Sequence, residues 1–315
     1  MKDVATANAG KFQDQFFTAK GEARARVSLS TPKTLWFNTG TLCNIECVNC
    51  YIESSPTNDA LVYITADEVR DYLGQLAEQK WPVTEIAFTG GEPFMNPDMI
   101  EMARASLECG YEVLILTNAM RPMMRRKMRE GLLELNAQFG DKLTLRISVD
   151  HYDAVLHDDE RGIGSFDKTL TGMKWLRDNG FRMAVAGRAV MAENETENRA
   201  GYAAFFDKHG FEIDAFDPIA TVLFPEMDTT VEVPEITTAC WGILNKSPDS
   251  LMCASSRMVV KRKGAGRPVV LSCTLLPYSE EFEMGEKLKD AEADVMLNHP
   301  HCAKFCVLGG ASCSA

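Results

Sequence analysis

The sequence predicts an α/β protein: a partial (β/α)6 barrel of parallel strands, followed by a small cysteine-rich α+β module. Three observations support this fold class. Over the first two thirds of the chain, β-branched apolar runs alternate with amphipathic stretches, which is typical of parallel strands joined by helices. The alternation stops near residue 221. Beyond that point lie a hairpin pattern and six of the ten cysteines.

Six apolar runs are expected to form the strands, at 34–40, 83–91, 112–118, 143–150, 181–190 and 211–219. The helical period of apolar residues between them predicts helices over 65–79, 97–110, 123–140, 165–180 and 195–210. Thr65 followed by Glu68 is the pattern of an N-terminal capping box. Helix C-terminal caps are expected at Gly110, Gly140, Gly180 and Gly210. Right-handed crossovers place the loops that follow the strands on one face, where a site is expected.

The tail is expected to be a separate unit. Residues 257–273 predict a β-hairpin, because two β-branched arms flank a Gly-Ala-Gly turn at 264–266. The predicted division is an N-terminal extension over 1–33, the partial barrel over 34–220 and the cysteine-rich module over 221–315.

Composition limits the possible partners and locations. The chain has 315 residues, a formal net charge of −12 and a pI near 5.0, which argues against nucleic acid or an anionic membrane as a partner. No apolar run resembles a signal peptide or a membrane helix. A cytoplasmic protein is therefore expected.

Cysteine spacing points to metal. In a reducing compartment clustered cysteines indicate metal ligands. Cys109 is isolated in the sequence and is expected to be a buried side chain that packs in the core. Cys43, Cys47 and Cys50 directly follow the first predicted strand. A structural zinc site normally needs four ligands, and no nearby His or Cys completes this one. Three thiolates suit a [4Fe-4S] cluster that leaves one iron without a protein ligand.

The C-x3-C-x2-C spacing, followed by TGGEP at 89–93 after the second strand, resembles the radical S-adenosylmethionine (radical SAM) superfamily. The resemblance covers roughly residues 34–219. It continues in the tail, whose cysteines and hairpin resemble the auxiliary-cluster modules called twitch or SPASM. Two departures concern the adenine side of the pocket: Asn49 replaces the aromatic residue often found before the third cysteine, and AVAGRAV (184–190) replaces a GxIxG pattern.

The resemblance implies that the cluster of Cys43, Cys47 and Cys50 chelates S-adenosylmethionine through its amino and carboxylate groups. Further cofactor-binding residues are expected at Gly90, Gly91 and Glu92 for the methionine ammonium, Ser148 for the ribose or carboxylate, Arg188 for the methionine carboxylate, and Tyr51, Thr117, Asn118 and Asp150 beside them. Other roles stay open: an ordinary turn for the Gly-Gly-Glu stretch and Ser148, an ion pair for Arg188, and helix caps for Asp150, Thr117 and Asn118.

One auxiliary [4Fe-4S] cluster is expected in the tail, because six cysteines suffice for one four-ligand cluster but not for two. The first choice of ligands is Cys253, Cys273, Cys302 and Cys306, with Cys313 in place of one of the last pair as the alternative. Cys240 is expected to be packing. A zinc site built from the same thiolates is the competing interpretation.

The resemblance implies an oxidoreductase in which a 5'-deoxyadenosyl radical removes a hydrogen atom from the substrate and the auxiliary cluster takes the second electron. An external one-electron donor of the flavodoxin or ferredoxin type is implied. Only about 33 residues precede the first strand, fewer than the leader-binding domain of many peptide-modifying relatives, which favours a small molecule or a peptide presented by a separate partner. The alternatives are a peptide-modifying enzyme, an adenosyl-transferring enzyme and a non-catalytic electron carrier.

Overall fold

A single curved sheet organises the chain, whose computed structural model describes residues 8, 10–189, 194–225 and 231–309. Within these residues nine strands are ordered β10-β9-β8-β2-β3-β4-β5-β6-β7, and all pairs from β8 to β7 are parallel. Their bounds are β2 Thr34–Asn38, β3 Glu85–Thr89, β4 Glu112–Thr117, β5 Leu143–Ser148, β6 Arg182–Arg188, β7 Thr221–Phe224, β8 Ser256–Val260, β9 Val269–Leu271 and β10 Glu283–Gly285. Because β7 and β10 are edges of the sheet, the barrel is partial and open.

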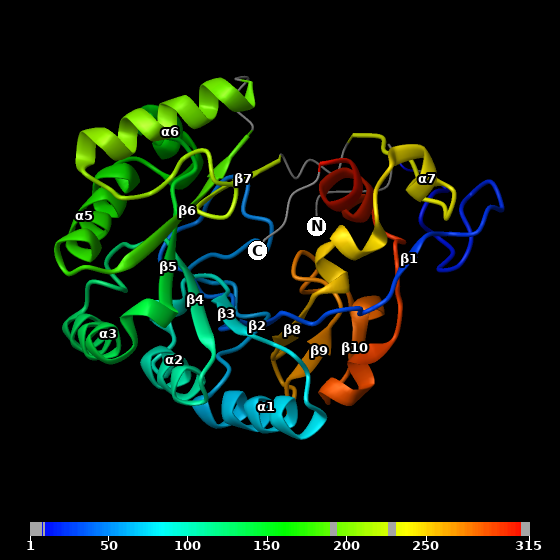
Figure 1. The fold of residues 1–315 in the computed structure, drawn as a ribbon, viewed down its shortest axis with the longest axis horizontal. Coiled ribbons are helices and arrows are strands. Elements are labelled where there is room, and N and C mark those ends of the chain that lie inside the picture. The colour runs from blue at the N-terminus through cyan, green and yellow to red at the C-terminus, as the bar shows by residue number, and fades with distance from the viewer. Residues whose placement is uncertain (1–7, 9, 190–193, 226–230, 310–315) are drawn as a thin grey trace.

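Helices cover the outer face of this sheet, as Figure 1 shows. They are α1 Ala66–Gln79, α2 Met99–Glu108, α3 Arg126–Phe139, α5 Ser165–Asp178 and α6 Glu195–His209, so all five predicted helices are present. The predicted capping box begins α1: the Thr65 hydroxyl accepts the Glu68 N–H, and the Glu68 carboxylate accepts the Thr65 N–H at 2.9 Å. Gly110, Gly180 and Gly210 have the positive φ that a helix C-terminus favours.

The two faces of the sheet pack into two different cores, because side chains alternate along each strand. Leu35, Phe37 and Ile86 belong to the core under the helices. Trp36 and Ala87, their neighbours in sequence, belong to a second core on the inner face with residues of the tail. Both faces are therefore apolar, which explains the continuous apolar runs of the predicted strands.

Two predictions about this part of the chain were wrong, and one helix was missed. Residues 211–219 do not form the sixth strand, which is β7 instead. Asp214 accepts the Phe216 N–H and Asp217 accepts the Ile219 N–H, so both aspartates form turns before the strand begins. Helix α4, Ala154–Arg161, was not predicted. Gly140 does not cap α3 in a left-handed conformation, since its φ is −49° and it continues into a 3-10 turn.

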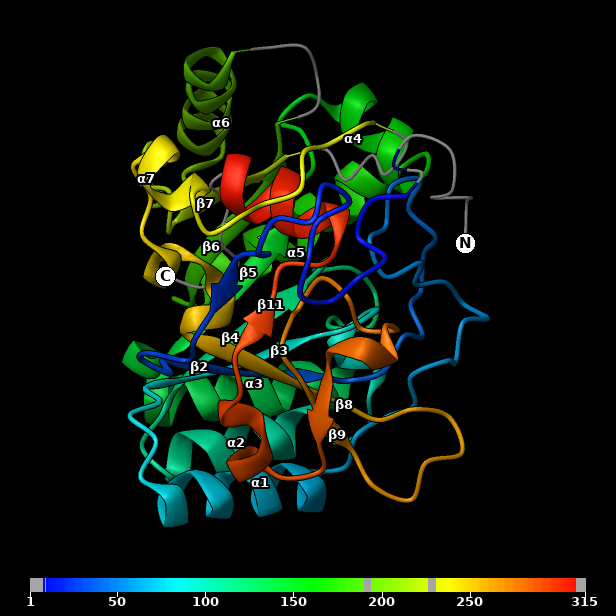
Figure 2. The ribbon, with the colours of Figure 1, turned by 90° about the vertical axis from the view of Figure 1, so that its right-hand side faces the viewer.

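The predicted hairpin is present and extends the main sheet. Strands β8 and β9 are antiparallel, and β8 also pairs in parallel with β2, the strand before the cysteine loop. Figure 2 shows β1, Arg26–Val27, beside β11, Val295–Met296, with which it pairs. The other helical elements are α7 Cys240–Leu244, a π-helix Cys302–Leu308, and 3-10 turns at Pro93–Met95, Gly140–Lys142, Pro248–Ser250, Met252–Ala254, Glu280–Phe282 and Leu288–Glu292.

Two further observations concern the surface. Cys109, expected to be buried, is exposed, because α2 ends at Glu108 and the chain turns through solvent before β4. No helix in the described part of the chain is long and apolar enough to cross a bilayer.

Candidate functional site

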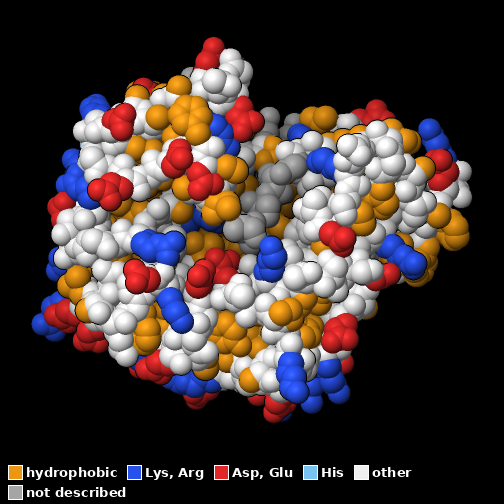
Figure 3. Space-filling view, in the orientation of Figure 1, with side chains coloured by type: hydrophobic (Ala, Val, Ile, Leu, Met, Phe, Trp, Pro, Cys, Tyr) orange, Lys and Arg blue, Asp and Glu red, His pale blue; other side chains and the backbone are white. Residues whose placement is uncertain are grey.

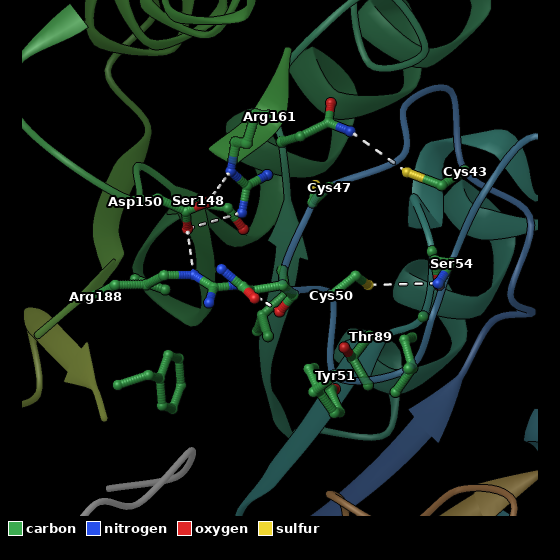
Figure 4. A pocket seen from close by; sticks show the side chains of 18 of the residues that line it. Cys43, Cys47, Cys50, Tyr51, Ser54, Thr89, Ser148, Asp150, Arg161 and Arg188 are labelled. Atoms are coloured by element: carbon green, nitrogen blue, oxygen red, sulfur yellow. Dashed lines mark hydrogen bonds and ion pairs between the residues drawn. The ribbon is translucent and has the colours of Figure 1, made fainter. Parts of the chain in front are cut away.

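A cavity lies where the carboxyl ends of the parallel strands meet, the edge at which open α/β sheets bind ligands. Each strand from β2 to β7 contributes to its wall, through its carboxyl end or through the loop that follows it, and so does the tail. Figure 3 shows that this face of the molecule is hollowed between the part carrying α5 and α6 and the part built from the tail. The polar lining, much of it drawn in Figure 4, comprises Cys43, Cys47, Asn49, Cys50, Tyr51, Ser54, Thr89, Thr117, Asn118, Ser148, Asp150, Arg161 and Arg188.

The loop after β2 brings all three predicted cysteine ligands to this cavity. Cys43 is buried, and its amide donates to the Ser55 carbonyl at 3.0 Å. The amide of Ser54 donates to the Cys50 sulfur at 3.4 Å. Burial raises the pKa of Cys43 to about 12 and also raises that of Cys47. Binding as thiolates would therefore require the positive charge of a bound metal group, which deprotonates its sulfur ligands.

The Gly-Gly-Glu stretch supports the cysteine loop. A Cβ on Gly90 would lie 2.6 Å from the Gly40 carbonyl oxygen, and one on Gly91 would lie 2.3 Å from that of Leu42. Both glycines are therefore required for the two loops to pack together. Their backbone also lines the cavity, which is compatible with the predicted contact to the methionine ammonium.

Glu92 is not among the residues that line the cavity, but it bonds to two that are. The residue is 2% exposed, and its carboxylate accepts hydrogen bonds from the Phe94 amide, the Thr117 hydroxyl at 2.8 Å and the Asn118 amide at 2.9 Å. Burial raises its pKa to about 7, against the opposing effect of these hydrogen bonds. Glu92 thus joins the loop after β3 to the end of β4, while its pairing with a methionine ammonium stays a prediction.

A buried charge network stands beside the cysteines. Arg161 donates two hydrogen bonds to Asp150, from Nε at 2.7 Å and from a terminal nitrogen at 3.1 Å. Arg188 Nε lies 3.5 Å from the same carboxylate, and Arg188 also donates to the Asn49 carbonyl at 2.5 Å. Arg161 holds the pKa of Asp150 below its usual range despite burial. The ion pair considered for Arg188 is therefore present in the structure.

Sequence reasoning missed two members of this network, Arg161 and Glu160. Glu160 accepts hydrogen bonds from the Asn49 side chain at 2.9 and 3.0 Å, next to Cys50. Both residues end α4, the helix that was not predicted. The available signal was Asp153, which caps α4 by accepting the amides of Val155 and Leu156.

The remaining predicted cofactor residues lie in the cavity wall. Ser148 and Tyr51 line it, and the Tyr51 side chain is 39% exposed. The Asn118 side chain donates to Asn44 at 3.0 Å and lies 3.9 Å from the Cys43 sulfur. Thr117 and Asn118 also accept the amides of Ala119 and Met120 two residues on, so they shape a turn as well.

A second cavity in the tail is lined by four cysteines: Cys253, Cys273, Cys302 and Cys306. These are the first-choice auxiliary ligands. Cys253 and Cys273 flank the β8–β9 hairpin, whereas Cys302 and Cys306 share one side of the π-helix, where the cavity meets them. Cys313 lies outside the described residues. Cys240 does not line this cavity; it packs against a neighbouring core and contacts the Thr237 amide.

The donor sets of both cavities fit iron–sulfur clusters. Nowhere in the described ranges do three His, Cys, Asp or Glu side chains come close enough for one metal ion. The four sulfur atoms around a tetrahedral zinc ion must lie close to one another, because all of them bind one ion. The thiolate sulfurs of a [4Fe-4S] cluster lie further apart, because each binds a different iron of a larger core. The three-cysteine cavity also provides polar strand ends for a cofactor on an open iron.

The two cavities share a wall. Leu275 lines both of them, and Phe305, which lines the first cavity, stands between Cys302 and Cys306 in the sequence. Phe305 stacks on Phe224 of β7 with ring centroids 5.8 Å apart. A group bound in the first cavity against this apolar wall would therefore lie between the two sets of cysteines.

A family model, that of the Radical SAM superfamily, matches residues 37–205, more than half of the chain. Among curated proteins, the AdoMet-dependent heme synthase of Methanosarcina barkeri is 29% identical over 155 residues, which are 48% of this chain and 41% of that protein. The antilisterial bacteriocin subtilosin biosynthesis protein AlbA of Bacillus subtilis is 33% identical over 145 residues, 46% of this chain and 30% of AlbA. The chain thus spans less than half the length of these relatives.

Solved structures share the fold. SuiB of Streptococcus suis bound to the precursor peptide SuiA aligns with a TM-score of 0.61 at 13% identity, over 84% of this chain and 66% of that one. Native anSMEcpe with bound AdoMet aligns with a TM-score of 0.57 at 13% identity, over 87% of this chain and 83% of that one. At such low identity the likeness concerns the fold alone.

Proposed function

The chain belongs to the radical SAM superfamily, and on that premise we propose that it is an oxidoreductase that removes a hydrogen atom from its substrate and passes one electron to an auxiliary iron–sulfur cluster. The observation that carries this proposal is the shared wall: a cavity with three cysteines and a cavity with four meet at Leu275. A substrate between them could lose a hydrogen atom on one side and an electron on the other.

When bound, the first cluster with S-adenosylmethionine supplies a 5'-deoxyadenosyl radical, and the second, fully ligated cluster supplies an acceptor for one electron. The chain's own part is to hold and orient. Cys43, Cys47 and Cys50 would ligate the first cluster, and the backbone of Gly90 and Gly91 would receive the methionine end.

The charge network would fix the geometry of the first site. Asp150 holds Arg161 and Arg188 in the wall beside Cys47, where their donors are available to an anionic ligand group. Asn118 and Ser148 add polar contacts from neighbouring strand ends. Positioning of this kind accounts for most of what a protein contributes when a cofactor carries the chemistry.

The substrate is proposed to be a peptide that presents an apolar side chain. Part of the cavity wall is apolar, formed by Leu116, Ala186, Phe224, Leu275 and Phe305. Relatives whose names refer to peptide products support this choice: AlbA, and the mycofactocin maturase MftC of Mycolicibacterium smegmatis, which is 26% identical over 58% of this chain and 43% of its own length. SuiB, which shares the fold, was solved with its precursor peptide.

A second candidate substrate is a porphyrin. It is favoured by the matches to an AdoMet-dependent heme synthase and to the Fe-coproporphyrin III synthase of Methanosarcina barkeri, the latter 28% identical over 49% of this chain and 36% of its own length. A cavity lined by apolar side chains and by two arginines would also suit an apolar macrocycle with carboxylate substituents.

The test is reductive cleavage of S-adenosylmethionine by the anaerobically reconstituted protein. We expect free 5'-deoxyadenosine from the wild type and none from the Cys47→Ala variant. Cys253→Ala should retain cleavage, because the first cavity is intact. Transfer of the adenosyl group without free 5'-deoxyadenosine, or no cleavage at all, would contradict the proposal. Loss of the hydrogen atom, the electron and a proton to solvent leaves the substrate two hydrogens lighter, and finding that loss in a peptide or in a porphyrin then separates the two substrate classes.

A further inference from the structure

A buried guanidinium lies beside Cys253, one of the four cysteines that line the second cavity. Arg257 on β8 is 1% exposed. Among the described residues its donors reach neutral carbonyl oxygens: Nε to Ala291 at 2.8 Å, and one terminal nitrogen to Cys253 at 2.6 Å and Ser256 at 2.9 Å. The other terminal nitrogen reaches the Ala293 carbonyl at 3.5 Å. These contacts satisfy hydrogen bonds but leave the positive charge in place.

The charge of Arg257 has no carboxylate to balance it within the described ranges. The ionisable groups that act on it are the thiols of Cys253 and Cys273, both lining the cavity. Arg24, another fully buried arginine, is different, since it pairs with Glu235 at 2.7 Å. Burying a cation without a counter-charge is costly, so such residues are normally paired. The counter-charge of Arg257 should therefore come from the cavity itself.

We propose that Arg257 is the counter-ion of a cluster bound by Cys253, Cys273, Cys302 and Cys306, and that it raises the reduction potential of that cluster. This inference rests on the proposed function, which places a cluster there. Four thiolates outweigh the positive charge of the cluster core, so the loaded site is anionic, and its net charge helps to set its potential. Reduction adds one more negative charge, which a nearby cation in a poorly screened interior stabilises.

This arrangement matches the role of the second cavity. An acceptor for an electron from a substrate radical works better at a higher potential. Arg257 is thus a positioning and tuning residue that acts through the cluster and touches no substrate. A purely structural role, in which the guanidinium ties the Cys253 turn to residues 291–293, would leave the potential independent of its charge.

The experiment is an anaerobic redox titration followed by electron paramagnetic resonance. The full chain carries the Cys43/Cys47/Cys50→Ala substitutions, so that iron binds only in the second cavity. Arg257→Gln removes the charge but keeps an amide donor, and Arg257→Lys keeps the charge. Arg24→Gln is the control, a buried arginine whose charge is already paired with Glu235 at 2.7 Å. Iron and sulfide are counted in every variant before titration.

We expect Arg257→Gln to lower the reduced-to-oxidised ratio at a fixed potential at least tenfold, a shift of about 59 mV for a one-electron couple. Arg257→Lys and Arg24→Gln should stay within about threefold of the parent protein. If Arg257→Gln fails to bind iron while Arg257→Lys binds it, the charge is needed for loading, which also supports the proposal.

Three results would overturn it. An unchanged potential in a fully loaded Arg257→Gln protein defeats the inference while leaving the proposed function intact. Equal effects of Gln and Lys, on potential or on loading, show that the shape of the guanidinium matters and not its charge. Absence of iron from the second cavity of the parent protein removes the auxiliary cluster itself, and the proposed electron transfer falls with the inference.

Discussion

Substituting Gly91 by alanine should separate the loop after β3 from the cysteine loop. The added Cβ would lie 2.3 Å from the Leu42 oxygen, 2.6 Å from the Leu42 carbonyl carbon and 2.7 Å from the Thr41 oxygen. All three are backbone atoms, so no side chain can rotate away. Relief requires the two loops to move apart.

That movement would break two hydrogen bonds between the loops: Gly91 N–H to the Gly40 carbonyl at 2.8 Å, and Glu92 N–H to the Leu42 carbonyl at 3.1 Å. Each is worth about 0.5–1.5 kcal/mol, and overpacking adds about 1–3 kcal/mol. We therefore expect Gly91→Ala to lower the free energy of unfolding by about 2–6 kcal/mol. Cys43 directly follows the displaced segment, so iron uptake at the first cavity should fall as well.

The assay is urea unfolding of the metal-free protein together with an iron count after reconstitution. Gly74→Ala is the matched control: Gly74 is an exposed residue inside α1, and an added methyl group there would have no other atom within 4 Å, so alanine should stabilise the helix by about 1 kcal/mol. A Gly91→Ala protein with wild-type stability and full iron content would refute this account of the Gly-Gly-Glu stretch.

Three further predictions concern buried charged and titratable groups. Arg161→Gln should lower the free energy of unfolding by about 3–5 kcal/mol, because Asp150 then keeps only the longer contact to Arg188. In urea unfolding, adding Asp150→Asn to the Arg161→Gln protein should recover part of this loss. Losses that simply add in the double variant would contradict the pairing. Burial lowers the pKa of His157 to about 4, so the neutral form is the folded one and stability should fall by about 1–2 kcal/mol between pH 7 and pH 5. The loss of stability between pH 7 and pH 5 should be smaller in His157→Phe than in the wild type when unfolding is measured at both pH values. An equal loss in the two proteins would contradict this role of His157. Glu92→Ala should cost about 2–4 kcal/mol in thermal or urea unfolding and Glu92→Gln less, since glutamine keeps an acceptor oxygen; equal losses would show that the acceptor contacts do not matter.

Much of the architecture could be predicted because it depends on local periodicity. The strands before residue 190 and all five outer helices follow from apolar spacing, and the hairpin follows from its glycine turn. The strand placed at 211–219 failed because Asp214 and Asp217 formed turns inside an apolar run. Helix α4 is short and polar, so its periodicity gave no signal and only its cap, Asp153, marked it.

The site shows the same division. The first cysteine group could be recognised from its spacing after a strand, and the tail group from its resemblance to auxiliary-cluster modules; the structure brings four tail cysteines to one cavity. The partners of Asp150 could not be predicted, because Arg161 comes from the helix that was missed. The Gly-Gly-Glu motif led to the prediction that Glu92 contacts the methionine ammonium. Its hydrogen bonds to Thr117 and Asn118 could not be predicted, because they depend on how neighbouring strands end. Arg257 gave no signal, since its burial without a carboxylate is a property of the fold.

Counting iron and sulfide after anaerobic reconstitution tests the central claim, that the two cysteine cavities hold two clusters. Three proteins are compared: the wild type, the Cys43/Cys47/Cys50→Ala variant and the Cys253/Cys273/Cys302/Cys306→Ala variant. We expect about eight irons in the wild type and about four in each variant. About four irons in the wild type, falling to none when Cys43, Cys47 and Cys50 are removed, would contradict it.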